Sequence, residues 1–370
     1  MNNFSLYFHI PFCKKKCPYC HFYVVKDRLE LQELLVESLQ MEWEQKRPLL
    51  EGKTLISIYF GGGTPSLLPP AAIETLLRMI WTSGFSLDGV EITMEANPEG
   101  VDLSYFTEIR SLGVNRLSIG VQSLDDRSLL IIGRGHGTHV AKKAIFTAHQ
   151  ASFENISIDL MYDLPDQSEK SFSYTLDQIP DLPIHHLSLY NLTIEPNTAF
   201  YRKKSALTLP DSASSLRLLN LALQKLPQCG FTRYEISAFA KDEKKSIHNL
   251  GYWTGRPFLG LGPSAFSYWE GARMRNILDL VRYAALLKQG KSPIDFSEKL
   301  PSPKDAQELF AVRLRLFDGA DLNHYPTLSQ ETVAVCRKWI HTGHLEQKGT
   351  HIRLTPQGTL FYDEIAADLI

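Results

Sequence analysis

The sequence lacks the features that would place it in a membrane or in the secretory pathway. It has no apolar run long enough to span a bilayer, and "MNNFSLYFHI" lacks a basic start followed by a long apolar stretch. It also lacks a strong charge bias, since the formal net charge of its 370 residues is −2. That balance gives no overall attraction to nucleic acid or to anionic membranes. We therefore expect a cytoplasmic protein without a transmembrane segment.

Cysteine is scarce, and its distribution is uneven. Of five cysteines, three fall in "CKKKCPYC", residues 13–20, in the spacing C-x3-C-x2-C. In a reducing cytosol, clustered thiols indicate metal binding or catalysis rather than disulfides. Cys229 and Cys336 stand singly in apolar surroundings, so we interpret them as small buried hydrophobic residues.

The first two hundred residues alternate between short β-rich runs and longer helical patterns. Six predicted strands are each followed by a predicted helix, which indicates right-handed βαβ units and a parallel sheet, either doubly wound or closed into a barrel. The predicted strands are residues 5–10, 55–60, 90–96, 115–121, 156–162 and 185–192.

Polar and glycine-bearing motifs follow these strands directly. In folds of this class, function collects at the carboxyl ends of the strands, so six such loops define one site on one rim. The motifs are "PFC", "GGGTPS", "EANPEG", "GVQS", "YDLPDQ" and "NLTIEP".

The pattern changes after residue 195. Beyond about residue 300, two helices (303–316 and 328–342), a β ribbon (344–355) and a last helix (356–368) predict a small winged-helix-like α+β domain. No basic helix stands out there, so we expect no nucleic-acid partner. The predicted domains are 1–240 for the barrel, 241–300 for an extension, and 301–370 for the C-terminal domain.

Three cysteines alone do not complete a metal site with four protein ligands. A structural zinc would need His9 or His21 as its fourth ligand. A [4Fe–4S] cluster held by three thiolates keeps one iron open to a small molecule, which suits a cluster that activates its ligand. The lysines between the ligands, Lys14 to Lys16, either offset the cluster's charge or form a solvated turn.

The cysteine spacing, with Tyr19 before the last cysteine and "GGGTPS" after the second strand, resembles the radical S-adenosylmethionine (SAM) superfamily. The resemblance implies a partial (β/α)6 TIM-like barrel, and a [4Fe–4S] cluster whose open iron is chelated by SAM. Reduction of the cluster then cleaves SAM to a 5′-deoxyadenosyl radical.

Motifs along nearly the whole chain resemble the oxygen-independent coproporphyrinogen III oxidase family, and in particular its HemW-like heme chaperone branch. They include "GVNRLSIGVQS", "YNLTIEPNT" and "HNLGYWTGRPFLGLGPSAFSY". Three features favour the chaperone branch. The chain begins shortly before the first cysteine, Phe22 stands where the oxidases carry a further cysteine, and residues 248–253 fit the HNxxYW heme-binding motif.

The resemblance implies a role for each matching residue. Cys13, Cys17 and Cys20 would ligate the cluster, and His248 would be the axial heme ligand, with Tyr252 and Trp253 against the porphyrin and Asn249 orienting the ring. No catalytic residue is assigned. The implied SAM-binding residues are Tyr7, Tyr19, Gly62, Gly63, Thr64, Glu95, Gln122, Arg134 and Asp159.

The sequence departs from the family pattern at a few positions. His21 stands where relatives commonly carry Asp, and Asp163 and Asp166 stand where Gly is usual. Phe266 occupies a position where chaperone relatives often have His. The resemblance is therefore weaker at the heme site than at the cluster site.

Three functions fit these residues. The first is a heme-trafficking protein that binds a [4Fe–4S] cluster, SAM and heme and delivers heme to client hemoproteins, with a small reductase or flavodoxin-type protein as electron donor. The second is an oxidase that converts propionates of coproporphyrinogen III to the vinyl groups of protoporphyrinogen IX. The third, a binding module with a vestigial cluster, agrees least with the intact cysteines and glycine loop. We favour the first.

Overall fold

The computed structural model describes residues 2–370 and is built on a mixed sheet of 12 strands. Its centre consists of six neighbouring strands that all run parallel, as the βα alternation predicts. Each lies within one or two residues of its predicted position, and β4 continues into the glycine loop. These strands are β1 (Asn3–Ile10), β4 (Thr54–Gly62), β5 (Glu91–Ala96), β6 (Arg116–Gln122), β7 (Ile156–Tyr162) and β8 (His186–Asn191).

Side chains of β1 alternate between two environments, as a strand requires. Phe4, Leu6 and Phe8 are fully buried in the main hydrophobic core, whereas Ser5 and Tyr7 face the barrel interior. The sheet therefore packs apolar residues against its helices and keeps polar ones inside.

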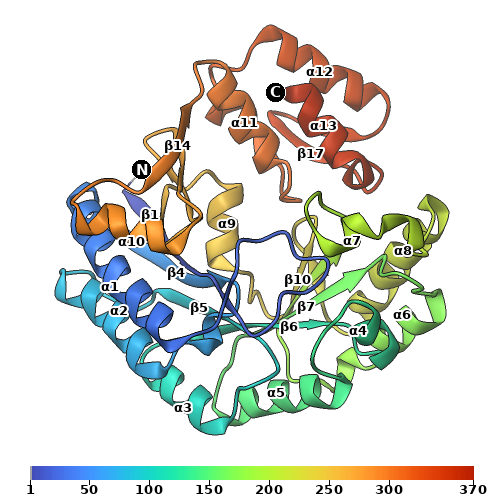
Figure 1. The fold of residues 1–370 in the computed structure, drawn as a ribbon. Coiled ribbons are helices and arrows are strands. Elements are labelled where there is room, and N and C mark those ends of the chain that lie inside the picture. Colours follow the sequence, from blue (N-terminus) through green and yellow to red (C-terminus); the bar gives the residue numbers. More distant parts are fainter. Residues whose placement is uncertain (1) are drawn as a thin grey trace.

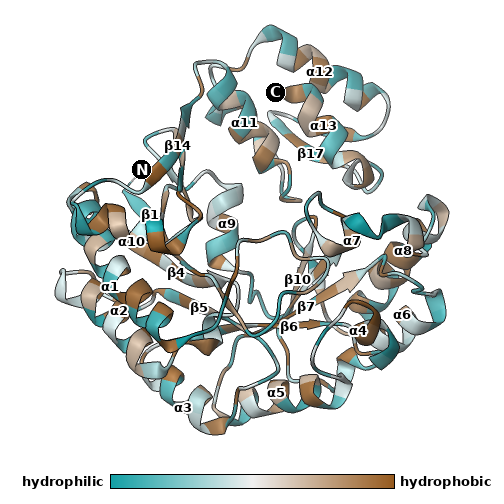
Figure 2. Ribbon diagram, in the orientation of Figure 1, coloured by the Kyte–Doolittle hydropathy of each residue, from teal (hydrophilic) through white to brown (hydrophobic). Residues whose placement is uncertain are grey.

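Helices cover the outer face of the barrel (Figure 1). In Figure 2 they carry both brown and teal turns, as amphipathic helices do when one face packs on a sheet. The predicted helical region at 125–150 forms two helices, separated by the loop that contains Arg134. The covering helices are α1 (Leu29–Lys46), α2 (Pro70–Thr82), α3 (Leu103–Ser111), α4 (Asp126–Ile131), α5 (Thr138–Gln150), α6 (Glu169–Leu176) and α8 (Ser212–Gln228).

The sheet extends beyond the six predicted strands at both edges. On one side, β11 (Phe258–Leu261) lies parallel to β1 and begins an antiparallel meander with β12 (Phe266–Trp269), β13 (Ala272–Asn276) and β14 (Ile294–Lys299). On the other side, β10 (Ala238–Ala240) and β9 (Thr232–Arg233) pair antiparallel beyond β8. The sequence analysis assigned no strand to residues 258–299, and helix α10 (Leu280–Lys288) was also missed.

A short helix, α9 (Ile247–Trp253), lies between the barrel and the C-terminal lobe (Figure 1). Its first two backbone N–H groups, of Ile247 and His248, donate to the Glu91 carboxylate at 3.0 and 2.8 Å. Glu91 is the first residue of β5, so α9 sits at the amino-terminal end of the parallel strands. We call this end of the barrel the floor, formed by Ser5, Ser57, Glu91, His186 and α9.

The C-terminal lobe has its own apolar core, around Phe310, Leu345 and Ile365. The order of helix, helix, ribbon and helix agrees with the prediction, although a 3-10 turn at 358–361 replaces the start of the last helix. Across residues 2–370, every helix is too short or too polar to cross a bilayer. The lobe contains α11 (Lys304–Arg313), α12 (Gln330–His341), β16 (Leu345–Lys348), β17 (His351–Leu354) and α13 (Tyr362–Leu369).

Candidate functional site

The three clustered cysteines lie in one loop at the carboxyl-terminal end of the barrel. Cys13 ends the short strand β2 (Phe12–Cys13), which pairs in parallel with β3 (Val25–Lys26) and so holds the two ends of the loop together. The N–H of Cys20 donates to the Cys17 carbonyl at 3.1 Å, which tightens the turn between them. The loop therefore carries three free, partly exposed thiols.

Burial acts against the ionised form of two of these thiols. It raises the pKa of Cys13, although the Thr64 hydroxyl, 3.5 Å from its Sγ, partly opposes the shift. Burial also raises the pKa of Cys20. A bound metal cation reverses this balance because it favours the thiolate. These thiols thus match a metal-binding role better than a role as free nucleophiles.

Arg134 brings a positive charge to the same loop. Its Nη1 lies 3.6 Å from Cys17 Sγ, and its Nη2 donates to the Gly120 carbonyl at 2.7 Å and to the Asn97 side chain. Its buried Nε has no hydrogen-bond partner among the described residues. A buried donor without a partner beside three thiols suits an anionic ligand group, such as a carboxylate.

The donor set fits an iron–sulfur cluster better than a single zinc ion. Within residues 2–370, no group of three or more His, Cys, Asp or Glu side chains is arranged around one metal ion. A cluster binds each thiolate at a different iron and does not require that convergence. Of the two candidate fourth ligands, buried His9 contacts the Tyr7 hydroxyl at 3.1 Å and the Tyr23 carbonyl at 3.4 Å, and burial lowers its pKa to about 4. His21 is exposed and packs on Phe22.

The glycine loop packs tightly against β1 and β2. A Cβ on Gly62, whose φ is +114°, would lie 2.7 Å from the His9 ring, and one on Gly63 would lie 2.6 Å from the Phe12 carbonyl oxygen. Only glycine fits this close approach. The loop therefore brings its backbone, and Thr64 after it, to the side of the cysteine loop.

Glu95 links the glycine loop to the barrel interior. Its carboxylate accepts hydrogen bonds from the Tyr59 hydroxyl at 2.9 Å and from the Gly62 N–H at 3.1 Å. Burial, with a smaller effect of the nearby Asp159 charge, raises the pKa of Glu95 to about 7. Burial raises the pKa of Asp159 as well, and the Ser118 hydroxyl donates to it at 3.3 Å. Two carboxyl groups thus face the interior above the strands' midpoint.

The other residues predicted to contact SAM lie on the same side of the barrel. The Tyr7 ring stacks on Tyr59 with centroids 6.1 Å apart, and burial raises its pKa well above the usual value. Tyr19 packs beside Phe200, and burial raises its pKa too. Gln122 ends β6 in a left-handed conformation, with φ of 69°. The structure therefore brings the cluster and SAM candidates to one end of the barrel.

The predicted heme residues lie at the other end. His248 is 1% exposed, and both of its ring nitrogens are engaged: Nδ1 lies 2.9 Å from the Ser57 hydroxyl and Nε2 lies 2.8 Å from the Tyr252 hydroxyl. Burial lowers the pKa of His248 to about 3, so the ring is neutral. Trp253 points away from the interior and packs against Arg315, while Asn249 is half-buried on the same helix.

The departures from the family pattern have local explanations. Asp163 and Asp166 adopt φ of 61° and 57°, in the left-handed region where glycine is usual, and Asp is among the residues that tolerate it. The Asp163 carboxylate accepts hydrogen bonds from Asn191 and Ser215, which fixes the loop after β7. Phe266 is 51% exposed on β12.

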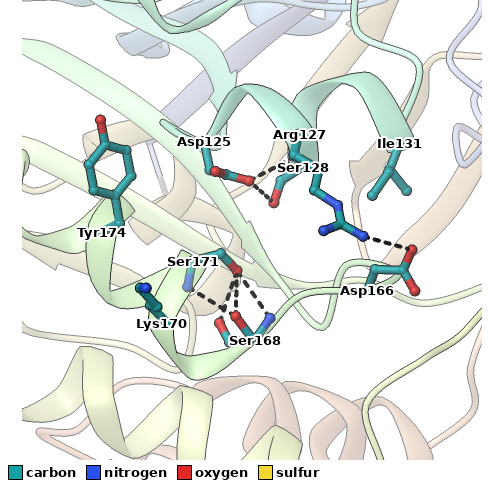
Figure 3. Close-up of a pocket in the computed structure, with 9 residues that line it drawn as sticks. All are labelled: Asp125, Arg127, Ser128, Ile131, Asp166, Ser168, Lys170, Ser171 and Tyr174. Carbon is teal, nitrogen blue, oxygen red and sulfur yellow. Dashed lines mark hydrogen bonds and ion pairs between the residues drawn. The ribbon is translucent and has the colours of Figure 1, made fainter.

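A surface pocket of about 400 Å³, lined by none of the predicted cluster, SAM or heme residues, lies between α4 and the start of α6 (Figure 3). Arg127 and Asp166 face each other there at 3.9 Å, and Ser168 and Ser171 bond to one another in a capping box that begins α6. The polar groups of this pocket serve the local structure, so we assign it no function.

Sequence reasoning missed two residues of the site. The Tyr59 hydroxyl donates to Glu95 and its ring stacks on Tyr7. The Asn97 side-chain oxygen accepts a hydrogen bond from Arg134. Tyr59 lies at an inward position of β4 and Asn97 lies in "EANPEG", so their place on the strand and loop was the available signal.

Comparisons with known proteins show which proteins the chain is similar to. A family model described as the radical SAM superfamily matches residues 7–179. The heme chaperone HemW of Escherichia coli (strain K12) is 33% identical over 370 aligned residues, which cover 98% of this chain and 96% of that protein. The mitochondrial radical S-adenosyl methionine domain-containing protein 1 of Danio rerio is 35% identical over 263 residues, 70% of this chain and 59% of that protein.

A solved structure of coproporphyrinogen III oxidase (HemN) from Escherichia coli, described as a radical SAM enzyme, superposes with a TM-score of 0.87. The match covers 100% of this chain and 90% of that one at 23% sequence identity. At that identity the likeness concerns the fold, which is that of a radical SAM barrel.

Proposed function

The chain belongs to the HemW heme chaperone family of the radical SAM superfamily, and on that premise we propose that it binds a [4Fe–4S] cluster, SAM and heme and delivers heme to client hemoproteins. The observation that carries the proposal is the loop of three free thiols, Cys13, Cys17 and Cys20, beside the unpaired Nε of Arg134. Three thiolates leave a cluster one iron for SAM, and Arg134 suits the SAM carboxylate.

The remaining SAM contacts follow from the chemistry of each group. Gly62, Gly63 and Thr64 offer backbone and hydroxyl groups to the amino-acid end, and Glu95 offers a carboxylate to its ammonium or sulfonium group. Asp159 suits a ribose diol, Tyr7 and Tyr19 would flank SAM near the cluster, and Gln122 would be a further SAM contact. When bound and reduced, the cluster supplies the electron that cleaves SAM. The protein's own residues orient the cofactor and limit water access.

The heme part of the proposal has one supporting feature in α9. Ser57 donates to Ser5, so His248 Nδ1–H donates to Ser57 and Nε2 accepts from the Tyr252 hydroxyl. An Nδ1–H hydrogen bond of this kind orients a metal-binding histidine and leaves Nε2 as the ligand atom. Iron binding at His248 then requires Tyr252 to move aside. Asn249 and Trp253 would contact the porphyrin from the same helix.

An electron donor completes the proposal. Lys14, Lys15 and Lys16 are exposed on the cysteine loop, and Phe22 beside them is 53% exposed. A cationic surface with an apolar residue next to the cluster suits an acidic small reductase or a flavodoxin-type protein.

We also propose that the chain divides into three domains, residues 1–240, 241–300 and 301–370. The separate apolar core of the last part supports its boundary.

The test is to reconstitute the protein anaerobically with iron and sulfide and to measure SAM cleavage on reduction, heme binding from the Soret band, and conversion of coproporphyrinogen III. The proposal predicts SAM cleavage and heme binding without conversion. Conversion of coproporphyrinogen III would instead support an oxidase, and failure to bind heme would remove the chaperone role.

A further inference from the structure

We propose that α9 supports the SAM site from below, and that His248 and Tyr252 position Tyr59 and, through it, Glu95. In this view the HNxxYW helix is a structural part of SAM binding, whatever its role toward heme. The inference rests on the proposed function, because it assumes that Glu95 binds SAM. It identifies positioning residues that act on SAM through Tyr59, without contacting SAM themselves.

The inward face of α9 contacts the wall of the barrel beneath Glu95. The His248 ring lies 4.9 Å from Tyr59 and 6.5 Å from Tyr7, between ring centroids. Tyr252, one helical turn later, holds His248 through its hydroxyl and packs edge-on against Phe258 of β11 at 4.6 Å. His248 is also tied to β4 by Ser57. The ring is thus fixed on two sides directly beneath the Tyr59 ring.

A direct chain of contacts runs from this ring to the glycine loop. Tyr59 packs on His248 with its ring and donates its hydroxyl to Glu95 Oε1 at 2.9 Å. Glu95 Oε2 in turn accepts the Gly62 N–H at 3.1 Å. Each link joins neighbouring groups, so loss of the ring beneath Tyr59 changes the position of a carboxylate that faces the proposed cofactor.

The outward face of α9 is held by the C-terminal lobe. The Arg315 guanidinium lies 4.3 Å from the Trp253 ring centroid, and Leu250 and Trp253 pack against a small cluster that includes Leu316. The Glu91 carboxylate fixes the start of the helix. Since α9 is held at its start and on both faces, the support it gives to Tyr59 is rigid.

The neutral state of His248 fits this role. A buried ring with a pKa of about 3 carries no charge at neutral pH, so it acts on Tyr59 through packing and hydrogen bonds. The Glu95 carboxylate therefore gains no salt bridge from His248. What the ring contributes is a defined position for Tyr59.

The test compares SAM affinity of anaerobically reconstituted variants, by equilibrium dialysis with labelled SAM, with their heme affinity from the Soret band. His248→Ala and Tyr252→Phe are expected to weaken SAM binding, by about tenfold and about threefold. His248→Gln keeps a polar group within reach of Tyr252 and is expected to recover part of the loss. Ile247→Ala, which removes a side chain 40% exposed on the same helix and keeps the backbone N–H, is the matched control and is expected to keep SAM affinity within about twofold.

Two results separate the inference from its premise. If wild-type protein fails to bind SAM, the proposed function itself is wrong. If wild-type protein binds SAM and both His248→Ala and Tyr252→Phe bind it equally well, the positioning role is overturned. Tyr252→Phe removes one hydroxyl and keeps the ring, so it answers the question even where His248→Ala does not fold.

Discussion

The two ends of the barrel differ in how their polar groups are used. At the carboxyl-terminal rim, three thiols are free, and the Arg134 guanidinium lies 3.6 Å from one of them. At the floor, both ring nitrogens of His186 have partners, Ser157 at 2.7 Å and Tyr234 at 2.9 Å, and both nitrogens of His248 are engaged as well.

We infer from this difference that the rim binds cofactors and that the floor mainly stabilises the fold. In barrels of parallel strands, ligand chemistry belongs to the rim, and the opposite end contributes stability. Loss of a rim side chain should therefore change cofactor content more than folding, and loss of a floor side chain other than His248 and Tyr252 should do the reverse. Glu95 lies between the two ends and should affect both.

The largest effect is expected for Cys17→Ala at the rim. Removal of one of three thiolates should reduce the iron and sulfide bound after reconstitution to near zero, because a cluster held by two protein ligands is not retained. Thermal unfolding of the cluster-free protein should change little. The measurement is iron and sulfide per chain. Cys229→Ala, at a lone half-buried cysteine, is the control and should keep full iron content; equal iron in both variants would refute the assignment of Cys17.

The next largest effect is expected at the floor. Glu91→Ala leaves the buried N–H groups of Ile247 and His248 without an acceptor, and we expect the free energy of unfolding to fall by about 3 kcal/mol. Urea denaturation of the cluster-free protein measures it. Asp102→Ala, which removes an exposed cap at the start of α3, should cost only about 1 kcal/mol. If both substitutions cost the same, the floor is less important to stability than we argue.

Glu95 gives a pH-dependent effect of intermediate size. Its pKa rises to about 7 in the folded protein from an ordinary 4.5, so the folded state keeps a proton that the unfolded state loses. Stability should therefore fall as pH rises from about 4.5 to 7, and Glu95→Gln should be more stable than wild type by about 2 kcal/mol at pH 8 but not at pH 4.5. Urea unfolding at the two pH values checks this. Asp159 and Arg116 face the same interior and remain in both proteins.

SAM binding should show the opposite trend with pH. The ionised Glu95 carboxylate attracts a cationic cofactor group, so affinity should increase as pH rises through 7 in wild type. This increase should be absent in Glu95→Gln. A wild-type affinity that stays constant between pH 6 and 8 would count against contact between Glu95 and SAM.

A smaller effect is expected where the floor meets the C-terminal lobe. Arg315→Ala removes the contact with the Trp253 ring and leaves Glu235, 3.5 Å away, without its partner, so we expect a loss of about 1.5 kcal/mol. Arg353→Ala, at an exposed pair with Glu346, should change stability by less than about 0.5 kcal/mol. Denaturation followed by tryptophan fluorescence distinguishes the two.

The smallest effect on stability is expected for the triple change of Lys14, Lys15 and Lys16 to Gln. Since these side chains are exposed, unfolding should shift by less than about 0.5 kcal/mol. Reduction of the cluster by an acidic flavodoxin should become slower and less dependent on salt. Substitution of Lys142 and Lys143 on α5 is the control, and equal rates in all three proteins would remove the docking role.

The six βα units could be predicted from the sequence because their signals are local. Strand and helix periods differ, and each motif after a strand lies within a few residues of it. The extension at β11–β14 could not, because "PFLGLG" reads as a glycine- and proline-rich loop, and its pairing with β1 is set by distant residues. The assignment of the three cysteines to a cluster stays a prediction, drawn from their spacing and from the family resemblance.

The environment of the predicted site residues was less predictable. His248 was expected at a heme site, but its contact with Ser57 was not predicted. Ser57 lies 191 positions earlier in the chain, so the contact depends on how α9 docks on the barrel. Tyr59 and Asn97 gave no signal of their own, because a tyrosine in a strand and an asparagine in a loop are ordinary. Asp163 and Asp166 stand where Gly is usual, and their positive φ is the backbone conformation that Gly favours, which the sequence alone did not reveal.

The parallel pairing of β1 with β11 has a consequence for how the protein is made. Ser5 lies opposite Phe258, so β1 lacks one of its two neighbouring strands until more than 250 further residues have been translated. The strand that leads into the cysteine loop is therefore among the last to be fully enclosed. Iron delivered after release of the finished chain should be incorporated more completely than iron offered to a nascent chain that stops before Phe258.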